Sequence, residues 1–180
     1  AGAHNCAMYS VYWNTPILTQ HVNVEPEQLK PSAAILGYMV SDYLLQKEFA
    51  LHISDPAMKN LFKMSIVAYT GKEEPNNEIL QMISPVYHVS EYTPPMFLWA
   101  TAEDGLVPAE HTLRMANALA QKNIPFEVHI FEQGPHGLSL ANQSTSGSRE
   151  QINQHAAKWV DLAEEWLLKR FALELPEKQS

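Results

Sequence analysis

The stretch that decides the fold is Pro95-Met-Phe-Leu-Trp-Ala-Thr-Ala-Glu-Asp-Gly-Leu-Val-Pro108, an apolar run that ends in a polar turn carrying Asp104. A second β-rich run ends in Gly134-Pro-His-Gly137, which carries His136. A helix-like segment lies between the two, so they form a predicted βαβ unit whose turns meet at one carboxyl edge of a parallel sheet. An acid and a histidine placed together there are two members of a hydrolytic triad.

Three runs predict the strands of this sheet. Residues 33–40 and 96–102 are continuously apolar, as strands buried on both faces of a parallel sheet are. Residues 126–132 alternate more, which is typical of a strand nearer the edge. The segment 41–92 is long for a plain crossover and is predicted to form an inserted, cap-like part. The order of elements predicts an α/β fold in which residues 1–180 form one partial domain with a mainly parallel sheet.

Helices are predicted at 3–13, 57–69, 76–83 and 109–121. Asn123 is a candidate left-handed stop for the last of these. A capping box at Ser148-Arg-Glu-Gln151 predicts the start of a further helix, and Pro176 predicts its end. The apolar stripe of that helix is Ile152, Ala156, Trp159, Val160, Ala163, Trp166, Leu167 and Phe171. Residues 15–31 contain three prolines and are expected to be a loop.

Composition narrows the class of partner. The net charge of −8 argues against nucleic acid or an anionic membrane surface, and no apolar run reaches the ~18 residues that span a bilayer. A single cysteine, Cys6, excludes an internal disulfide framework and favours a reducing, cytoplasmic compartment. Its apolar surroundings predict a buried thiol.

The sequence motifs do not indicate a metal or cofactor site. His88, His129, His136 and Asp104 lack the spacing of a metal site, so neither a metal nor a cofactor is expected. A nucleotide-binding Rossmann domain is disfavoured, because no Gly-x-Gly-x-x-Gly follows a predicted strand.

The motifs resemble a known superfamily. Phe97-Leu-Trp-Ala-Thr-Ala-Glu-Asp104-Gly-Leu-Val-Pro108 and Gly134-Pro-His136-Gly-Leu-Ser139 resemble the acid and histidine motifs of α/β-hydrolases. Ser84-Pro85 and Thr93-Pro94-Pro95 resemble the approach to the acid strand. The similarity is to the C-terminal half of small bacterial esterases, related to acetyl esterases and hormone-sensitive-lipase-like carboxylesterases. It covers nearly the whole chain but only about half of that fold.

The resemblance implies roles for individual residues. His136 would be the general base, and Asp104 would orient and stabilise its imidazole. Ala1-Gly2-Ala3-His4 resembles the tail of a Gly-x-Ser-Ala-Gly nucleophile elbow, which puts the nucleophilic serine just upstream of Ala1. Ala1 would then contribute its backbone N–H to the oxyanion hole.

Alternatives remain open at this point. Asp104 could belong to an ordinary Asp-Gly strand-end turn, and His136 could be a loop histidine bonded to a carbonyl. The chain has no Gly-x-Ser-x-Gly and no His-Gly-Gly-Gly loop, so alone it is expected to be inactive. It could be a fragment that serves only as a packing or dimerisation module, or part of a peptidase or thioesterase.

The expected partners follow from the same reasoning. They are a small-molecule ester, a complementary N-terminal segment or partner chain, and, as a further option, a second copy of the chain. The open apolar edge at residues 33–40 and the helix at 3–13 are expected to be buried against such material.

Overall fold

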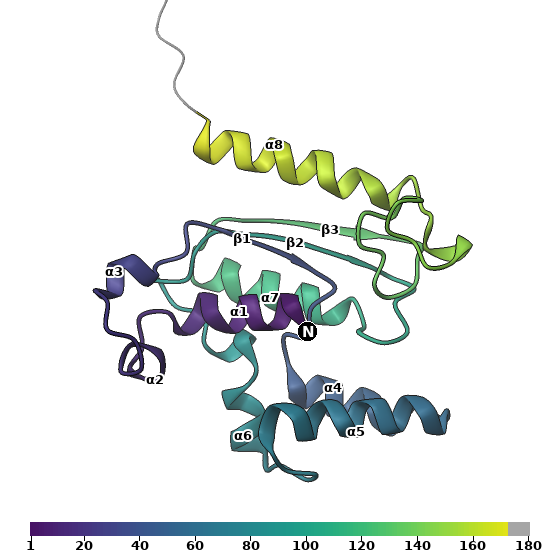
Figure 1. Cartoon of the computed structure of the whole chain (residues 1–180), viewed down its shortest axis with the longest axis horizontal. Helices are drawn as coiled ribbons and strands as arrows, with labels where there is room; N and C mark the ends of the chain where they lie inside the picture. Colours follow the sequence, from purple (N-terminus) through teal and green to yellow (C-terminus); the bar gives the residue numbers. More distant parts are fainter. Residues whose placement is uncertain (173–180) are drawn as a thin grey trace, which may run out of the picture.

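The computed structural model describes residues 1–172, which form a parallel three-stranded sheet with helices on both faces (Figure 1). The strands are β1 (Ala34–Gly37), β2 (Met96–Thr101) and β3 (Phe126–Phe131), in the order β1-β2-β3. Met96 pairs with Ala34 on one side and with Phe126 on the other. The predicted α/β fold with three parallel strands is therefore confirmed.

The burial of each strand depends on its position in the sheet. The central strand β2 is buried along its whole length, whereas β3 is mostly half-buried. β1 is the other edge among the described residues, and its Ile35 is 37% exposed. β1 is also shorter than the predicted run, because Tyr38 adopts a φ of 40° and turns the chain out of the sheet.

The helices, in chain order, are α1 (Gly2–Tyr12), α2 (Pro16–Thr19), α3 (Pro26–Leu29), α4 (Tyr43–Leu51), α5 (Pro56–Thr70), α6 (Asn77–Met82), α7 (Glu110–Gln121) and α8 (Trp159–Phe171). Three short 3₁₀ turns are η1 (Pro85–Tyr87), η2 (Arg149–Gln151) and η3 (Ala156–Lys158). Figure 1 shows α1 and α7 on one face of the sheet and α8 on the opposite face. Within residues 1–172, no helix has the length and apolar character needed to cross a bilayer.

The two faces have separate apolar cores. Between the sheet and helices α1 and α7 lie buried side chains that include Leu36, Leu98 and Met115. On the α8 face, Phe97 and Trp99 pack with other aromatic and apolar side chains, among them Trp166. Successive β2 side chains alternate between these two clusters. The parallel pairing of β2 with β3 places the turns that follow them at the same edge of the sheet.

The prediction of a loop over residues 15–31 is wrong in part, since α2 and α3 interrupt it. Both short helices begin with a proline at the first helical position, where the missing N–H costs nothing. α3 also has a capping box, in which Glu25 and Gln28 satisfy each other's backbone N–H groups.

The last helix begins later than predicted. The capping box at Ser148 forms, but it caps only η2. The Asn153 side chain then accepts hydrogen bonds from the N–H groups of His155 and Ala156, so the continuous helix α8 begins at Trp159. Of the predicted stripe, Ala156, Ala163 and Trp166 are buried, whereas Ile152, Val160 and Phe171 are exposed. The predicted end at Pro176 lies outside the described residues.

Helix α1 packs one narrow stripe, formed by His4, Ala7, Ser10 and Val11, into the molecule. Cys6 lies off this stripe and is exposed, so the prediction of a buried thiol is wrong. Helical spacing explains why Cys6 is exposed. Residues three or four positions apart share one face of a helix, and position 6 does not lie on the face that is buried.

The segment 41–92 is mainly helical. Asp42, Asp55 and Asn76 cap α4, α5 and α6 by accepting hydrogen bonds from backbone N–H groups. Helix α4 was not predicted from the sequence, although Asp42 is a typical N-cap. Figure 1 shows these helices as a group set apart from the sheet, beyond α1 and α7.

Candidate active site

Asp104 lies in the turn directly after β2, and its carboxylate is fully buried. Oδ1 accepts hydrogen bonds from the backbone N–H groups of Leu106 (2.9 Å) and Val107 (2.8 Å). Oδ2 lies 2.7 Å from Nδ1 of His136. The two backbone contacts fix one oxygen and leave the other for the imidazole.

His136 lies in the loop after β3, where the backbone takes conformations that favour glycine. Gly134 has a φ of 131° and Gly137 a φ of 80°. The hydroxyl of Thr101 donates to the carbonyl of Gly134 at 2.7 Å, and the Gly134 N–H donates to the carboxylate of Glu103 at 3.1 Å. The end of β2 therefore holds the histidine loop, and Glu103 supports the backbone rather than the imidazole.

Tyr38 supports His136 from the side of β1. Its ring meets the imidazole edge-on at 4.9 Å between centroids, and it meets Trp99 at 5.0 Å. Its hydroxyl accepts a hydrogen bond from the N–H of Ser139 at 3.3 Å. The segments that follow all three strands thus contribute residues to the same edge of the sheet.

The hydrogen bonds determine which nitrogen of His136 carries the proton. An ionised carboxylate can only accept, so Nδ1 must be the donor to Asp104. Nε2 then has a free lone pair, and the side chain is 27% exposed. The pair can act as an oriented general base.

A cavity of about 220 Å³ lies in front of His136. Its lining residues are Ala1, His4, Tyr38, Val40, Tyr43, Gln46, Leu61, Phe62, Ser65, Tyr69, Leu106, Val107 and His136. Ala1 and His136 both line the cavity, and residues after β1, in α4 and in α5 complete its wall. His4, which bonds the carbonyl of Val40 through Nδ1 (2.9 Å), has its pKa lowered by burial and packs against Tyr43.

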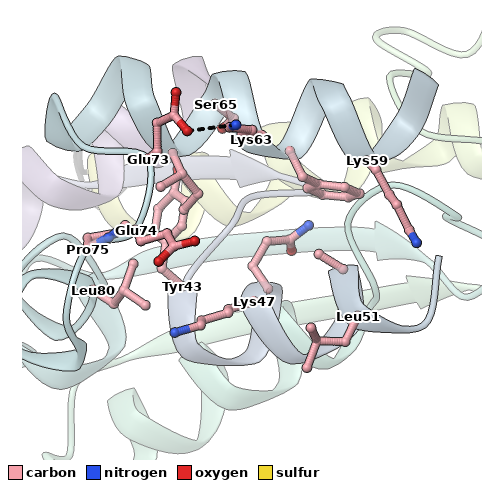
Figure 2. Close-up of a pocket in the computed structure, with 14 residues that line it drawn as sticks. Tyr43, Lys47, Leu51, Lys59, Lys63, Ser65, Glu73, Glu74, Pro75 and Leu80 are labelled. Carbon is pink, nitrogen blue, oxygen red and sulfur yellow. Dashed lines mark ion pairs between the residues drawn. The ribbon is translucent and has the colours of Figure 1, made fainter. Parts of the chain in front are cut away.

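A larger cavity of about 450 Å³ lies among α4, α5 and the start of α6 (Figure 2). It shares Tyr43, Gln46, Phe62 and Ser65 with the first cavity, so these side chains separate the two spaces. An ion pair between Lys63 and Glu73 (2.7 Å) lies at its rim.

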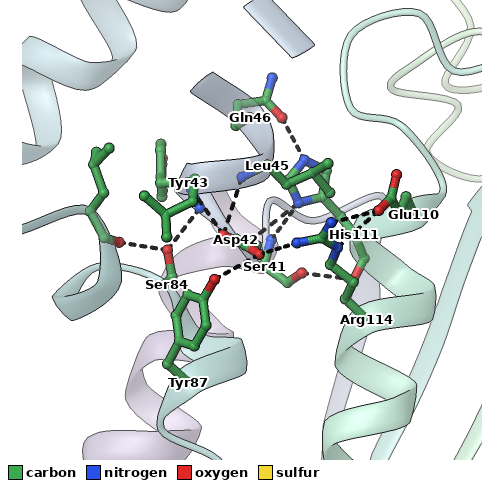
Figure 3. A network of polar contacts seen from close by, with 12 residues as sticks. Ser41, Asp42, Tyr43, Leu45, Gln46, Ser84, Tyr87, Glu110, His111 and Arg114 are labelled. Carbon is green, nitrogen blue, oxygen red and sulfur yellow. Dashed lines mark hydrogen bonds and ion pairs between the residues drawn. The ribbon is translucent and has the colours of Figure 1, made fainter. Parts of the chain in front are cut away.

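A buried polar network lies behind the acid turn (Figure 3). Asp42 accepts hydrogen bonds from Arg114 (2.7 Å) and from the hydroxyl of Tyr87 (3.1 Å). Nδ1 of His111 accepts from the N–H groups of Ser41 and Asp42, both at 3.3 Å. The network joins the start of α4 to helix α7.

His111 is held neutral within this network. Burial lowers its pKa to about 4, and the nearby Arg114 guanidinium adds to the shift, while the Asp42 carboxylate opposes it. The backbone donors at Nδ1 act in the same direction, since they need the unprotonated nitrogen.

The depressed pKa of His111 predicts a loss of stability in acid. The unfolded chain takes up a proton near pH 6.5, whereas the folded protein resists it down to about pH 4. The contribution of His111 to the free energy of unfolding is fully present above pH 6.5. It is lost as the pH drops through this window, and the total loss is about 3 kcal/mol. Urea unfolding at several pH values measures the free energy of unfolding directly.

The control is a pair of substitutions. His111→Gln removes the titrating group, so its free energy of unfolding should fall less than that of the parent between pH 6.5 and 4. His155→Gln, at an exposed position, should retain the parent's pH dependence. If the free energy of unfolding changed equally with pH in the parent and in His111→Gln, His111 would not be the source of the acid sensitivity.

The sequence predicted Asp104, His136 and Ala1 as site residues but gave no sign of the network behind them. Gln46 and His111 are 65 positions apart, and no motif links them. The local signal that could have pointed to this part of the network was Asp42, a typical N-cap for the helix that carries Gln46. Among residues 1–172, no group of three His, Cys, Asp or Glu side chains could hold a metal ion.

A buried Asp–His pair on the turns after adjacent parallel strands, in the order acid then histidine, is the arrangement found in α/β-hydrolases. Residues 37–167 match the prolyl oligopeptidase family, and the chain belongs to that family.

Solved structures with this fold include hydrolases of bacterial origin. The chain is 28% identical to the carboxylesterase Cest-2923 from Lactobacillus plantarum WCFS1, with a TM-score of 0.67 over 94% of this chain and 55% of that one. It is 29% identical to the acetyl ester-xyloside bifunctional hydrolase from Caldicellulosiruptor lactoaceticus, with a TM-score of 0.68 over 94% and 53% of the two chains.

One curated protein matches a shorter stretch. Endo-1,4-beta-xylanase B of Butyrivibrio fibrisolvens is 46% identical over 68 residues, which are 38% of this chain and 11% of the xylanase. The chain therefore spans about half the length of the two solved structures and about a tenth of the xylanase. The α/β-hydrolase resemblance seen in the sequence is confirmed at the level of fold and family.

Proposed function

We propose that the chain supplies the acid and the general base of a serine hydrolase that cleaves small carboxylic esters. The observation that carries this proposal is the 2.7 Å contact between buried Asp104 and His136, beside a cavity. In this role Nε2 of His136 takes the proton of the attacking serine hydroxyl. The resulting imidazolium, stabilised by Asp104, then protonates the leaving alkoxide.

The nucleophile comes, in this proposal, from polypeptide next to Ala1. Within residues 1–172, Asp104 is the hydrogen-bond partner of the His136 ring. Ala1, at the start of α1, lines the same cavity, so a serine immediately before it would lie near His136. The N–H of Ala1 would then face the developing oxyanion, a contact worth about 2.7 to 4 kcal/mol in transition-state stabilisation.

The same polypeptide would cover the free edge of the sheet. β1 is an edge strand among the described residues, and half-exposed Ile35 lies on it. Exposed apolar edges favour pairing with another strand. A complementary N-terminal segment is thus proposed as the partner of β1 and α1.

The substrate class is narrowed by the cavity and by the relatives. A space of about 220 Å³, walled by Tyr38, Phe62 and Tyr69, fits a short acyl group better than a long chain. One structural relative is named for acetyl ester and xyloside hydrolysis, so acetylated sugars are the first natural esters to test. Peptide cleavage is a second candidate, because the family is named for oligopeptidases.

The experiment compares the 180-residue chain alone with the same chain joined at Ala1 to the proposed N-terminal segment, here called the joined protein. Each is treated with a fluorophosphonate probe and measured by intact mass, and hydrolysis of a chromogenic acetyl ester is followed in parallel. We expect the joined protein to be labelled and active, and the chain alone to be neither.

The variant His136→Ala in the joined protein should abolish both label and hydrolysis. An unlabelled, inactive joined protein would overturn the esterase proposal and favour a module that only packs or dimerises. Label on the chain alone would contradict a nucleophile outside it. Faster cleavage of an acylated peptide than of the acetyl ester would favour the peptidase.

A further inference from the structure

The turn that carries Asp104 is held from a second side by Gln46. The backbone of Leu106 is the shared element, because its N–H donates to Oδ1 of Asp104 at 2.9 Å. The carbonyl of the same residue accepts a hydrogen bond from Nε2 of Gln46 at 3.1 Å. Helix α4 thus anchors the residue that fixes the carboxylate.

The orientation of the Gln46 amide is set by His111. Nδ1 of His111 accepts two backbone hydrogen bonds, so the ring proton is on Nε2. Nε2 lies 2.6 Å from Oε1 of Gln46 and donates to it (Figure 3). This leaves the amide NH₂ group of Gln46 for the carbonyl of Leu106. The tautomer of His111 therefore sets the orientation of the Gln46 amide, and that orientation points the amide donor at Leu106.

Burial makes this arrangement costly to change. Gln46 and His111 are both buried, so a lost hydrogen bond is not replaced by water. Gln46 also lines both cavities.

We infer that Gln46 and His111 are positioning residues, which hold the turn of Asp104 so that its carboxylate stays aligned with His136. The inference rests on the proposed role of Asp104 as the acid of a hydrolytic triad. Gln46 itself makes no hydrogen bond to the His136 imidazole or to the Asp104 carboxylate, and it acts through the backbone of Leu106.

Two substitutions at position 46 separate the links. Gln46→Met removes both hydrogen bonds at nearly constant length. Gln46→Glu keeps an acceptor for His111 but has no donor for the Leu106 carbonyl when ionised. Gln121→Met, at the exposed end of α7, is the matched control for replacing a helical glutamine.

The spectroscopic readout is the Nδ1–H proton of His136 in the NMR spectrum of the chain, which the bond to Asp104 shifts far downfield and protects from exchange. We expect both Gln46 variants to lose or broaden this resonance while circular dichroism stays at the parent level, and Gln121→Met to retain it. If Gln46→Met does not fold, Gln46→Glu alone decides. An unchanged resonance in a folded Gln46 variant would overturn the inference.

A kinetic readout in the joined protein distinguishes positioning from binding. Misplacement of the acid should lower kcat by about 10- to 100-fold and leave KM nearly unchanged. A rise in KM with unchanged kcat would assign Gln46 to the substrate pocket instead and overturn the positioning role. Because the NMR result does not require hydrolysis, failure of the esterase proposal would be seen separately, as an inactive joined protein with an intact His136 resonance.

Discussion

Replacing Asp104 by asparagine is expected to lower kcat of the joined hydrolase by about 10⁴-fold. The Asn oxygen can still accept from the N–H groups of Leu106 and Val107, so the turn should keep its shape. Its NH₂ group would then face Nδ1 of His136, in the place of the carboxylate oxygen. The imidazole would have to accept at Nδ1 and carry its proton on Nε2, which is the wrong tautomer for a base.

The measurement is kcat for acetyl ester hydrolysis, together with circular dichroism and the free energy of unfolding. Asp161→Asn is the matched control, because it makes the same change at an exposed position of α8. We expect Asp161→Asn to retain the parent's kcat. A folded Asp104→Asn protein with less than a tenfold loss would rule out Asp104 as the acid, and Glu103 would then be the next residue to test.

The sheet could be predicted from the sequence because the signals that mark its strands are local. Continuous apolar runs bounded by turns identified β1 and β2, and alternation identified β3 as an edge. The order of strand, turn and helix was enough to bring Asp104 and His136 to one edge, since parallel connections leave few topologies.

What the sequence did not predict depends on contacts between distant segments or on competition between local signals. The partnership of Gln46 with His111 requires the packing of α4 against the start of α7, which no periodicity specifies. At the last helix, the capping box of Ser148 was real, but Asn153 interrupted the helix with its own hydrogen bonds. The prediction used only the first of these two cap-like signals.

Trp99 joins the core to the histidine loop, and we expect Trp99→Ala to lower the free energy of unfolding by about 3 to 5 kcal/mol. The indole stacks on Trp159 at 5.0 Å and meets Tyr38 edge-on at 5.0 Å. Gly37 permits this packing, because a Cβ there would lie 2.8 Å from the indole nitrogen. The variant leaves a large cavity in a β2 position that is only 2% exposed.

The same variant should also lower kcat, since the contacts of Trp99 lead to His136. Tyr38 packs directly on the imidazole, and Trp159 donates to the carbonyl of Ser139 in the loop that follows it, at 2.8 Å. Trp13→Ala is the matched control, because Trp13 is equally buried but bonds to Tyr92. We expect both variants to lose stability by urea unfolding, and only Trp99→Ala to lose kcat when assayed where both remain folded. Equal kcat values for the two would show that the aromatic cluster supports the fold without aligning the histidine loop.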